Sequence, residues 1–536
     1  MSITITPQST VTLCKTKLEN DYKNTLNFSN LAAQTSYFNG LTGQLDVTEN
    51  DYTYIRKDNV ITVGYPYDQL IGYNYLYYTN TGFTNKRYYC FINKIEYVSE
   101  NSTKLYIETD VIQTYMFDLT YNQCYVEREH VADDSIGANT VPELLETGEY
   151  IINGTDYIMY DTNQNVCIAV SSTINTGLYH ASTTSYNNVF SGEFLYTFDN
   201  PEQARNFLDI FDQAGQGEAV NSVYMIPGTL FNKLTKTSHT DTSYGITCTY
   251  YTVSGTSGNF IETQKNITMN TSLNGYTPKN KKLLCYPYNY LEIDNNNGAS
   301  AIYHFEQFVN HAASFQVAGA ITPGCSIMCY PLNYNLKSDD HILTTGMLYS
   351  YNDGIPAGKY PIGSWRSDVY TNWLTQTGAN RTFGLIKDSV SAIGSAAMGN
   401  VGGAVNSVSN IFGTAVEVYQ HSLTPYQTKG NSNSGDVTFA IKQTMFAIKN
   451  KCIKQEYARI IDGFFNLFGY KVNRLKVPQF TSRTNWNYVK TIDSNMEGDI
   501  PQEDLQKIRS IFDNGVTFWH NPATMLDYTQ NNTIVS

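Results

Sequence analysis

A long stretch without charge, Phe383–Val418, constrains the fold of this chain more than any other segment. Its central part, Ser389–Val416, holds 28 consecutive residues without a charged side chain, although 15% of all residues in the chain are charged. Apolar residues recur there every three or four positions, which is the spacing of one helix face. The stretch is long enough to cross a bilayer, which takes about 20 residues. The pair Gly402-Gly403 near its middle is a candidate hairpin hinge.

Four structures are compatible with this stretch. A buried pair of core helices would explain the apolar stripe, and a flexible linker would explain the Gly, Ala and Ser content. A segment at an oligomer interface is the third possibility, and a sequestered segment that enters a membrane is the fourth. The other face carries Ser, Asn and Gly rather than Lys and Glu, so it is not a charged amphipathic helix. The pattern alone leaves all four open.

The rest of the chain predicts a mainly β protein with a few helices. The chain has 44 tyrosines and many threonines, which favour pleated, half-exposed surfaces. Its 536 residues imply several domains. The runs that resemble strands include Ser9–Cys14, Arg87–Val98, Thr103–Ile112, Ala301–Val309, Trp486–Thr491 and Val516–His520.

Three helices are predicted outside the uncharged stretch. The first is capped by Asn200, starts at Pro201, ends at Gly215 and buries Phe207, Ile210 and Phe211. The second is Ile448–Phe468, with an apolar side made of Cys452, Ile460, Ile461, Phe464, Phe465 and Phe468. The third starts at Pro501, stops at Asn514-Gly515 and buries Leu505, Ile508 and Ile511. The region after residue 430 is expected to complete a sheet begun near the N-terminus.

The sequence contains none of the catalytic or phosphate-binding motifs that we searched for. It has no G-x-S-x-G elbow, no phosphate-binding G-x-x-x-x-G-K-[ST] and no H-E-x-x-H. We therefore predict no enzyme, and no catalytic, cofactor or metal residues. The formal charge of −13 does not suit a protein that clamps DNA phosphates. The nine scattered cysteines have the pattern of buried free thiols, and the lone pair Cys325 and Cys329 lacks the second pair that a zinc site needs.

One acidic cluster with a histidine invites comparison with a metal site. Glu127, Glu129 and His130 lie close together in the chain, and divalent metals bind His together with carboxylates. Alternate residues of a strand face opposite ways, however, so Glu127 and Glu129 would share one face, with Arg128 and His130 on the other. We therefore interpret the cluster as a polar strand end that is paired with its neighbours.

Several short blocks, taken together and in this order, resemble one family. They are Asp110–Asp118 (DVIQTYMFD), Cys124–Val131 (CYVEREHV), Asn139–Tyr150 (NTVPELLETGEY), Lys281–Leu291 (KKLLCYPYNYL), Phe464–Asn473 (FFNLFGYKVN), Asn487–Thr491 (NYVKT) and Asn514–His520 (NGVTFWH). The set resembles the distal tail knob protein of small short-tailed phages, the protein-primed podovirus type that infects Gram-positive bacteria. The resemblance covers most of the chain and is weakest across residues 155–275.

This resemblance implies a fold and a role. The family forms a hexameric hollow tube at the tail tip, built mainly from β-barrel-like domains, and the first and last parts of each chain combine into the tube wall. The genome leaves through the bore. A long apolar loop of each subunit plugs the bore before infection and is then released to form a pore in the host cytoplasmic membrane. By position, the matching loop in this chain is Phe383–Val418.

The implied site residues all belong to this loop. The membrane-insertion residues are Leu385, Ile386, Val390, Ile393, Ala397, Met398, Val401, Val405, Val408, Ile411, Phe412 and Val416, with Gly402 and Gly403 as the hinge. The charged flank is Asp388, Glu417 and His421. Protonation of the two carboxylates lowers the cost of insertion, whereas His421 gains a charge and has to stay at the interface. On balance we expect acid to promote membrane activity.

The resemblance also implies a domain plan and partners. The predicted parts are an N-terminal β tube domain (1–138), a β-rich middle domain with one helix (139–282), a third β-rich domain (283–380), the apolar loop (381–430) and a C-terminal part that completes the tube wall (431–536). The partners are five further copies in a homo-hexamer, the lower collar or tail tube protein, genomic DNA in non-specific transit and host membrane lipids. No cofactor is implied. The location is the distal end of the virion tail, after synthesis and assembly in the host cytoplasm.

Two other functions compete with this prediction. A tail-tip adhesin without membrane activity would use tyrosines to stack on glycans. A tail-associated cell-wall hydrolase is the other alternative, and the absence of catalytic motifs disfavours it.

Overall fold

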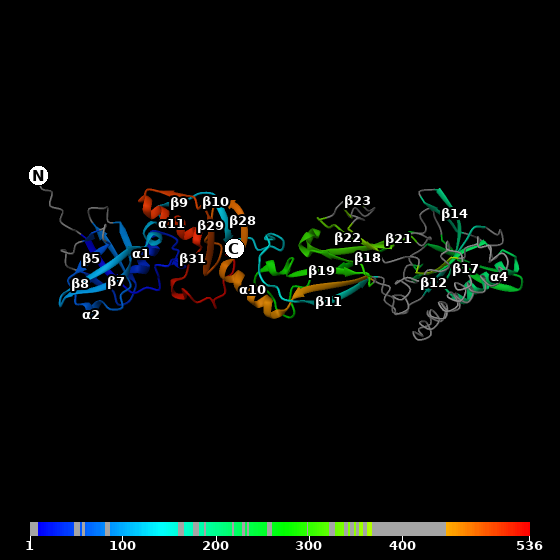
Figure 1. Ribbon diagram of the computed structural model, residues 1–536, viewed down its shortest axis with the longest axis horizontal. Helices are drawn as coiled ribbons and strands as arrows, with labels where there is room; N and C mark the ends of the chain where they lie inside the picture. Colours follow the sequence, from blue (N-terminus) through cyan, green and yellow to red (C-terminus); the bar gives the residue numbers. More distant parts are fainter. Residues whose placement is uncertain are drawn as a thin grey trace, which may run out of the picture. The chain divides into compact units, whose positions relative to one another are not determined.

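The structure is a computed structural model, and strands dominate it (Figure 1). It describes residues 9–47, 54–55, 59–80, 86–158, 166–174, 182–186, 189–216, 219–227, 231–232, 235–253, 260–296, 298–320, 327–336, 341–342, 348–349, 353–356, 362–366 and 446–535. Two compact units divide the chain. Unit 1 is Met1–Glu146, Pro278–Leu283 and Glu456–Ser536, and unit 2 is Thr147–Thr277 and Leu284–Gln455. The prediction of a mainly β protein with a few helices is confirmed, whereas the five-part domain plan stays a prediction.

The first sheet of unit 1 is antiparallel and has the strand order β3-β1-β6-β7-β8-β5-β4. Its strands are β1 (Ser9–Cys14), β3 (Leu45–Val47), β4 (Tyr54–Ile55), β5 (Val60–Val63), β6 (Tyr75–Asn80), β7 (Arg87–Ser99) and β8 (Ser102–Thr109). The predicted strand Thr103–Ile112 is wrong at its end. The Asp110 carboxylate accepts a hydrogen bond from the Gln113 N–H at 3.1 Å and so caps the short helix α3 (Val111–Tyr115). Helices α1 (Leu31–Asn39) and α2 (Tyr67–Leu70) also belong to this unit.

The second sheet of unit 1 joins the two ends of the chain. Its order is β2-β31-β29-β10-β28, with β2 (Asn24–Leu26), β10 (Cys124–Glu129), β28 (Tyr470–Lys476), β29 (Trp486–Ile492) and β31 (Val516–Trp519). Strand β10 pairs with β28 on one side and with β29 on the other, and these three lie together in Figure 1. The short pair β9 (Leu119–Tyr121) and β30 (Met496–Gly498) lies beside this sheet. The prediction that the C-terminal region completes a sheet begun near the N-terminus is confirmed.

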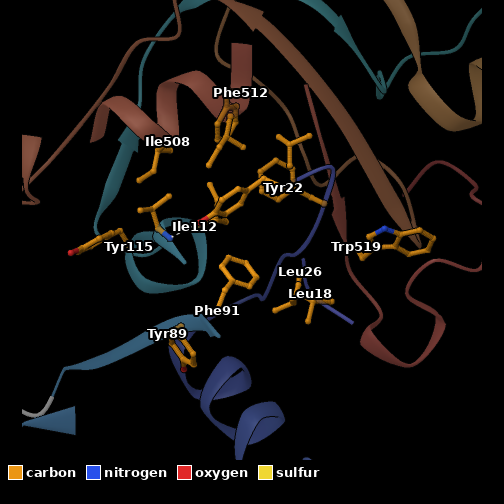
Figure 2. Close-up of a cluster of buried hydrophobic side chains, with 14 of the residues drawn as sticks. Leu18, Tyr22, Leu26, Tyr89, Phe91, Ile112, Tyr115, Ile508, Phe512 and Trp519 are labelled. Carbon is orange, nitrogen blue, oxygen red and sulfur yellow. Dashed lines mark hydrogen bonds between the residues drawn. The ribbon is translucent and has the colours of Figure 1, made fainter. Parts of the chain in front are cut away.

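One apolar core of unit 1 likewise draws on both ends of the chain. Tyr22 and Phe91 come from the N-terminal part, and Ile508 and Phe512 come from helix α11 (Gln502–Asn514). Figure 2 shows these side chains converging around Ile112. The predicted third helix, with Leu505, Ile508 and Ile511 buried, is confirmed. Because the core needs both ends of the chain, unit 1 cannot fold from either end alone.

The predicted helix Ile448–Phe468 is wrong in its first part. Residues Phe446–Ile453 form strand β27, and the helix α10 is Gln455–Phe468. Along β27 the lysines at 449 and 451 alternate with buried residues, which is the period of a strand rather than of a helix. Within α10, Ile461 and Phe465 are buried, whereas Ile460 is 69% exposed. The predicted apolar side therefore combined residues of a strand with residues of a helix.

Gly469 connects α10 directly to β28. It adopts φ of 65°, the left-handed conformation that ends many helices, and its N–H donates to the Phe465 carbonyl at 2.8 Å. A Cβ atom at this position would lie 2.1 Å from the Glu129 carbonyl oxygen of the neighbouring strand β10. Both the backbone conformation and the close approach therefore require glycine.

We expect Gly469→Ala to lower the free energy of unfolding of unit 1 by about 2–3 kcal/mol, from left-handed strain and overpacking combined. Gly463→Ala is the matched control, because Gly463 lies in the same helix with nothing within 4 Å of its Cβ position. That variant should be stabilised by about 0.5–1 kcal/mol through helix propensity. Urea unfolding of both variants measures the difference, and equal stabilities would contradict the account of this turn.

The described residues of unit 2 form three sheets. Their orders are β16-β17-β14-β12-β15-β26 with β13 on β14, β18-β21-β22-β24-β23 with β25 on β22, and β11-β27-β19-β20. The strands are β11 (Tyr150–Ile158), β12 (Val166–Ser172), β13 (Ser182–Tyr186), β14 (Val189–Phe198), β15 (Val220–Pro227), β16 (Lys236–Ser243), β17 (Ile246–Val253), β18 (Phe260–Ile267), β19 (Asn289–Asp294), β20 (Ser300–Tyr303), β21 (Ala313–Ala320), β22 (Ile327–Leu332), β23 (His341–Ile342), β24 (Leu348–Tyr349), β25 (Ile355–Pro356) and β26 (Ile362–Arg366). Side chains of all three sheets share one core, including Leu195, Phe315 and Ile448.

The single long helix described in unit 2 follows the sequence pattern. Helix α4 is Pro201–Gln213, the Asn200 side chain accepts from the Glu202 N–H at 2.8 Å, and Phe207, Ile210 and Phe211 are buried. The prediction for this helix is confirmed. The predicted strand Ala301–Val309 is partly wrong. Strand β20 ends at Tyr303, and 3-10 turns over Phe305–Gln307 and Val309–His311 follow it.

Candidate functional site

The predicted loop lies outside the residues that the structure describes. This applies to the membrane-insertion residues from Leu385 to Val416, to the hinge Gly402-Gly403 and to the flank Asp388, Glu417 and His421. Among the helices of the described residues, none combines the length and the apolar character that crossing a membrane takes. The candidate site that the described residues provide is therefore in unit 1, where the two ends of the chain meet.

A buried carboxylate, Glu143, lies at the centre of a group of charges that we call the polar junction. Its Oε1 accepts from Lys282 Nζ at 2.7 Å and from the Lys471 backbone N–H at 2.8 Å, and its Oε2 forms an ion pair with Arg128. The side chains of Glu143 and Lys282 are only 2% and 4% exposed. Burial works to raise the pKa of Glu143, but Lys282, the Lys471 N–H and Arg128 together hold it below its ordinary value.

The cations of the polar junction have further partners. Lys282 Nζ also donates to the Val141 carbonyl at 2.8 Å. Arg128 donates to the Gly469 carbonyl at 2.8 Å, and its guanidinium lies 4.8 Å from the centre of the Phe464 ring. Each buried cation is therefore paired and hydrogen-bonded, which is the condition under which buried charges are tolerated.

Two more carboxylates extend the junction. Asp462 of α10 accepts from the backbone N–H groups of Lys279 and Asn280 at 2.8 and 3.0 Å. Asp134 accepts from the Lys281 N–H at 3.1 Å and from the Tyr470 hydroxyl, and burial raises its pKa. The chain passes through unit 1 three times, and these contacts fasten the three passes to one another.

Strand β10 ends in an irregular region. A bulge between Val126 and Arg128 interrupts the strict alternation that the sequence predicted there. Glu129 is buried and pairs with Lys476, whereas Glu127 is half-buried and pairs with Lys490 at 2.8 Å. Each of the two carboxylates therefore has its own lysine. The described residues contain no group of three or more His, Cys, Asp or Glu side chains placed to hold a metal ion.

Two histidines directly follow strands of this sheet, His130 after β10 and His520 after β31, and burial favours the neutral form of both. His130 Nδ1 accepts from the Tyr488 backbone N–H at 2.7 Å, so its Nε2 carries the proton and donates to the Asn466 carbonyl at 3.1 Å. Burial, followed by the charge of Arg483, lowers the pKa of His130 to about 3. A second proton, on Nδ1, would point at the Tyr488 N–H from which Nδ1 now accepts a hydrogen bond.

His520 has an analogous environment. Its Nδ1 lies 3.3 Å from the Asn27 amide nitrogen, and its Nε2 lies 3.0 Å from Asn487 Oδ1. Burial lowers its pKa to about 4. The Asn487 amide donates to Ser482 Oγ at 2.7 Å, and Ser482 donates to the His130 carbonyl at 2.9 Å. One hydrogen-bonded network therefore connects both histidines.

The cysteine prediction is confirmed for the part of the chain that is described. Eight cysteines there are free and buried, and Cys325 lies outside that part. Burial raises the pKa of Cys14 to about 12, so its thiol stays protonated and unreactive at neutral pH.

Sequence reasoning did not identify the polar junction or the histidine network. The family resemblance nevertheless marked this region. Residues of the polar junction and of the histidine network lie in the blocks that carry the resemblance, namely Arg128, His130, Glu143, Lys282, Tyr470, Asn487 and His520. Their chemistry is that of a structural fastening rather than of catalysis, since each charge is already satisfied by a protein partner.

Comparisons with known proteins show which proteins this chain is similar to. Residues 250–533 match the family model of the C-terminal domain of the Bacillus phage phi29 tail knob protein gp9, and residues 7–120 match the N-terminus of the caudoviral major tail protein. The tail knob protein gp9 of Bacillus phage B103 is 28% identical, over 96% of each chain. That of Bacillus phage phi29 is 26% identical, over 95% of this chain and 96% of the relative. The structure of the bacteriophage C1 tail knob protein gp12 matches 98% of this chain with a TM-score of 0.63 at 16% identity, which shows a shared fold.

Proposed function

Because the chain belongs to the family of the phi29 tail knob protein gp9, we propose that six copies form a hollow tube at the distal end of a phage tail. The chain is a structural protein of the virion tail. In the proposed tube, β-barrel-like domains form the wall, and the tube is joined to the lower collar or tail tube protein. The genome leaves through its bore. The net charge of −13 suits a conduit that does not retain DNA, because it repels phosphate.

The architecture of unit 1 supports the tube-wall role. A sheet that joins β2 near the N-terminus to β31 near the C-terminus, with β10 between β28 and β29, locks the two ends of the chain together. The polar junction fastens the middle pass of the chain, Pro278–Leu283, to the same unit through Lys282. A segment inserted between such fastened passes can be released without opening the wall. The uncharged stretch lies in the insertion between residues 284 and 455.

We assign the stretch Phe383–Val418 the role of bore plug and membrane-insertion loop. A helical hairpin about Gly402-Gly403 satisfies its own backbone hydrogen bonds in lipid. Small residues such as Gly394, Ala397 and Gly399 allow close contact between helices, so that several copies can associate. An apolar loop exposed on the virion would favour aggregation, which is a physical reason to keep it inside the bore.

Leakage of dye from liposomes tests this role. We expect the full chain to cause leakage, more at about pH 5 than at about pH 7, because a larger fraction of Asp388 and Glu417 is protonated at the lower pH. Deletion of residues 385–427 should abolish leakage at both pH values.

A single substitution, Val405→Asp, should weaken the leakage strongly, since an aspartate near the bilayer centre costs about 2.5–3.5 kcal/mol. Leu144→Asp is the matched control, because Leu144 is exposed in unit 1. Leakage by the deletion variant equal to that of the full chain would exclude the insertion role.

A further inference from the structure

An exposed apolar row crosses three strands of the second sheet in unit 1. Tyr125 of β10 lies directly opposite Leu475 of β28 on one side and Ile492 of β29 on the other. The three side chains are 36%, 74% and 46% exposed. Directly opposed residues on neighbouring strands have their Cβ atoms about 5 Å apart, so the three form one continuous patch rather than scattered residues. We call Tyr125, Leu475 and Ile492 the apolar row.

The row reaches an open edge of the sheet. In the described part of the chain, β28 is the last strand of the order β2-β31-β29-β10-β28 and pairs only with β10. An edge strand presents unpaired backbone N–H and C=O groups, and proteins blunt such edges with charge or cover them. Strand β28 carries Lys471, Arg474 and Lys476 and no acidic residue of its own. Lys476 already pairs with Glu129, and the Lys471 backbone N–H already donates to Glu143, so the exposed Arg474 is the main cation that this edge offers to a partner.

A second surface segment of the same unit has the opposite charge. The segment 493–504 contains Asp493, Glu497, Asp499, Glu503 and Asp504 and no basic residue. The first four of these side chains are exposed. Strand β30 and the first turn of α11 hold the segment in place. Unit 1 therefore carries an apolar edge with a basic strand, and an acidic segment that begins directly after Ile492 of the apolar row.

We propose that a second copy of this chain covers the apolar row, with its acidic segment 493–504 facing the basic edge strand β28. The contact joins two different surfaces, so it is head-to-tail and repeats from copy to copy until a ring closes. Opposite charges across the contact set its register, and the apolar row supplies the area removed from water. The proposal rests on the proposed ring and names the surfaces that build it.

A substitution in the apolar row tests the contact. Leu475→Asp in the full chain should weaken self-association at least tenfold in sedimentation velocity. The thermal unfolding midpoint should stay that of the native chain, because the side chain is already exposed. Leu31→Asp is the control, since Leu31 is an exposed apolar residue at the start of α1 and should associate like the native chain. Equal association of the two variants would overturn the proposal.

A charge reversal tests the partner surface. The single variant Arg474→Glu should associate at least tenfold more weakly than the native chain. The double variant Glu497→Lys with Asp499→Lys should be weakened by at least the same factor. An equimolar mixture of the two proteins should recover association, because each contact in an alternating ring then joins opposite charges. A mixture that associates no better than its components would exclude the acidic segment as the partner surface. A native chain that stays monomeric would instead contradict the proposed ring itself.

Discussion

Replacing Glu143 by Ala is expected to lower the free energy of unfolding of unit 1 by about 3–5 kcal/mol. The substitution leaves the ammonium of Lys282, whose side chain is 4% exposed, and the guanidinium of Arg128 without their common carboxylate. It also removes the acceptor of the Lys471 N–H. The loss exceeds that of an ordinary salt bridge because the Lys282 ammonium stays buried and the Arg128 side chain is only 14% exposed. Urea unfolding at neutral pH measures the effect.

Glu149→Ala is the matched control for this prediction. Glu149 also pairs with a lysine, Lys454, at 2.9 Å, but its side chain is 84% exposed. Exposed pairs contribute little, so this variant should unfold at the denaturant concentration of the native chain. A third variant replaces both partners, with Glu143→Gln and Lys282→Met, and should recover part of the loss because one buried charge is removed with its partner. Equal stability of Glu143→Ala and Glu149→Ala would contradict the account of the polar junction.

Acid is expected to destabilise unit 1 through His130 and His520. Their pKa values in the folded chain are about 3 and about 4, below the ordinary value near 6.5 that applies to the unfolded chain. The unfolded chain therefore binds protons first as the pH falls. The stability from the neutral rings is complete above about pH 6.5 and is lost from there down to about pH 4 for His520 and about pH 3 for His130. At pH 5 each histidine contributes a loss of about 2 kcal/mol, since one pKa unit corresponds to 1.36 kcal/mol.

Buried carboxyls in the same unit act in the opposite direction. Burial raises the pKa of Asp110 to about 6, so protonation favours the folded chain between about pH 7 and pH 5, by about 1 kcal/mol. Burial also raises the pKa of Glu129 and Asp134. The total pH dependence of unit 1 is therefore a difference between opposing groups, and a single variant isolates the contribution of the histidine.

The variant His130→Gln separates the contribution of His130 to the pH dependence from that of the buried carboxyls. Its amide can accept from the Tyr488 N–H and donate to the Asn466 carbonyl as the neutral imidazole does, but it does not titrate. The loss of unfolding free energy from pH 8 to pH 5 should be about 2 kcal/mol smaller in this variant than in the native chain. His304→Gln is the control, because His304 lies in unit 2, where it stacks on Tyr286. An unchanged pH dependence in His130→Gln would contradict the assignment.

Local signals in the sequence were sufficient for some elements. Helix α4 was predicted because its cap Asn200, its first residue Pro201 and its buried face lie within one short segment. The division between β27 and α10 was missed because Cys452 belongs to a buried strand face that runs directly into a buried helix face. The end of the predicted strand Thr103–Ile112 was missed because Asp110 caps a helix of only five residues.

Long-range pairings are the part of the structure that could not be predicted from the sequence. Lys282 and Glu143 are separated by 139 positions, and Tyr470 and Asp134 by 336, so no local pattern links them. The quoted blocks contain Glu143, Lys282 and Tyr470 without giving their contacts, and Asp134 lies outside every block. The predicted loop and its twelve apolar residues remain a hypothesis from the sequence and the family resemblance.

The most direct test of the account is an end-on image of the assembled full chain, beside that of a variant lacking residues 385–427. We predict a hollow ring of six copies in both, with density in the bore of the full chain that is missing from the variant. Matching unfolding midpoints of unit 1 would establish that the deletion leaves the wall intact. A monomer, a particle without a bore, or a bore that is unchanged by the deletion would contradict the account.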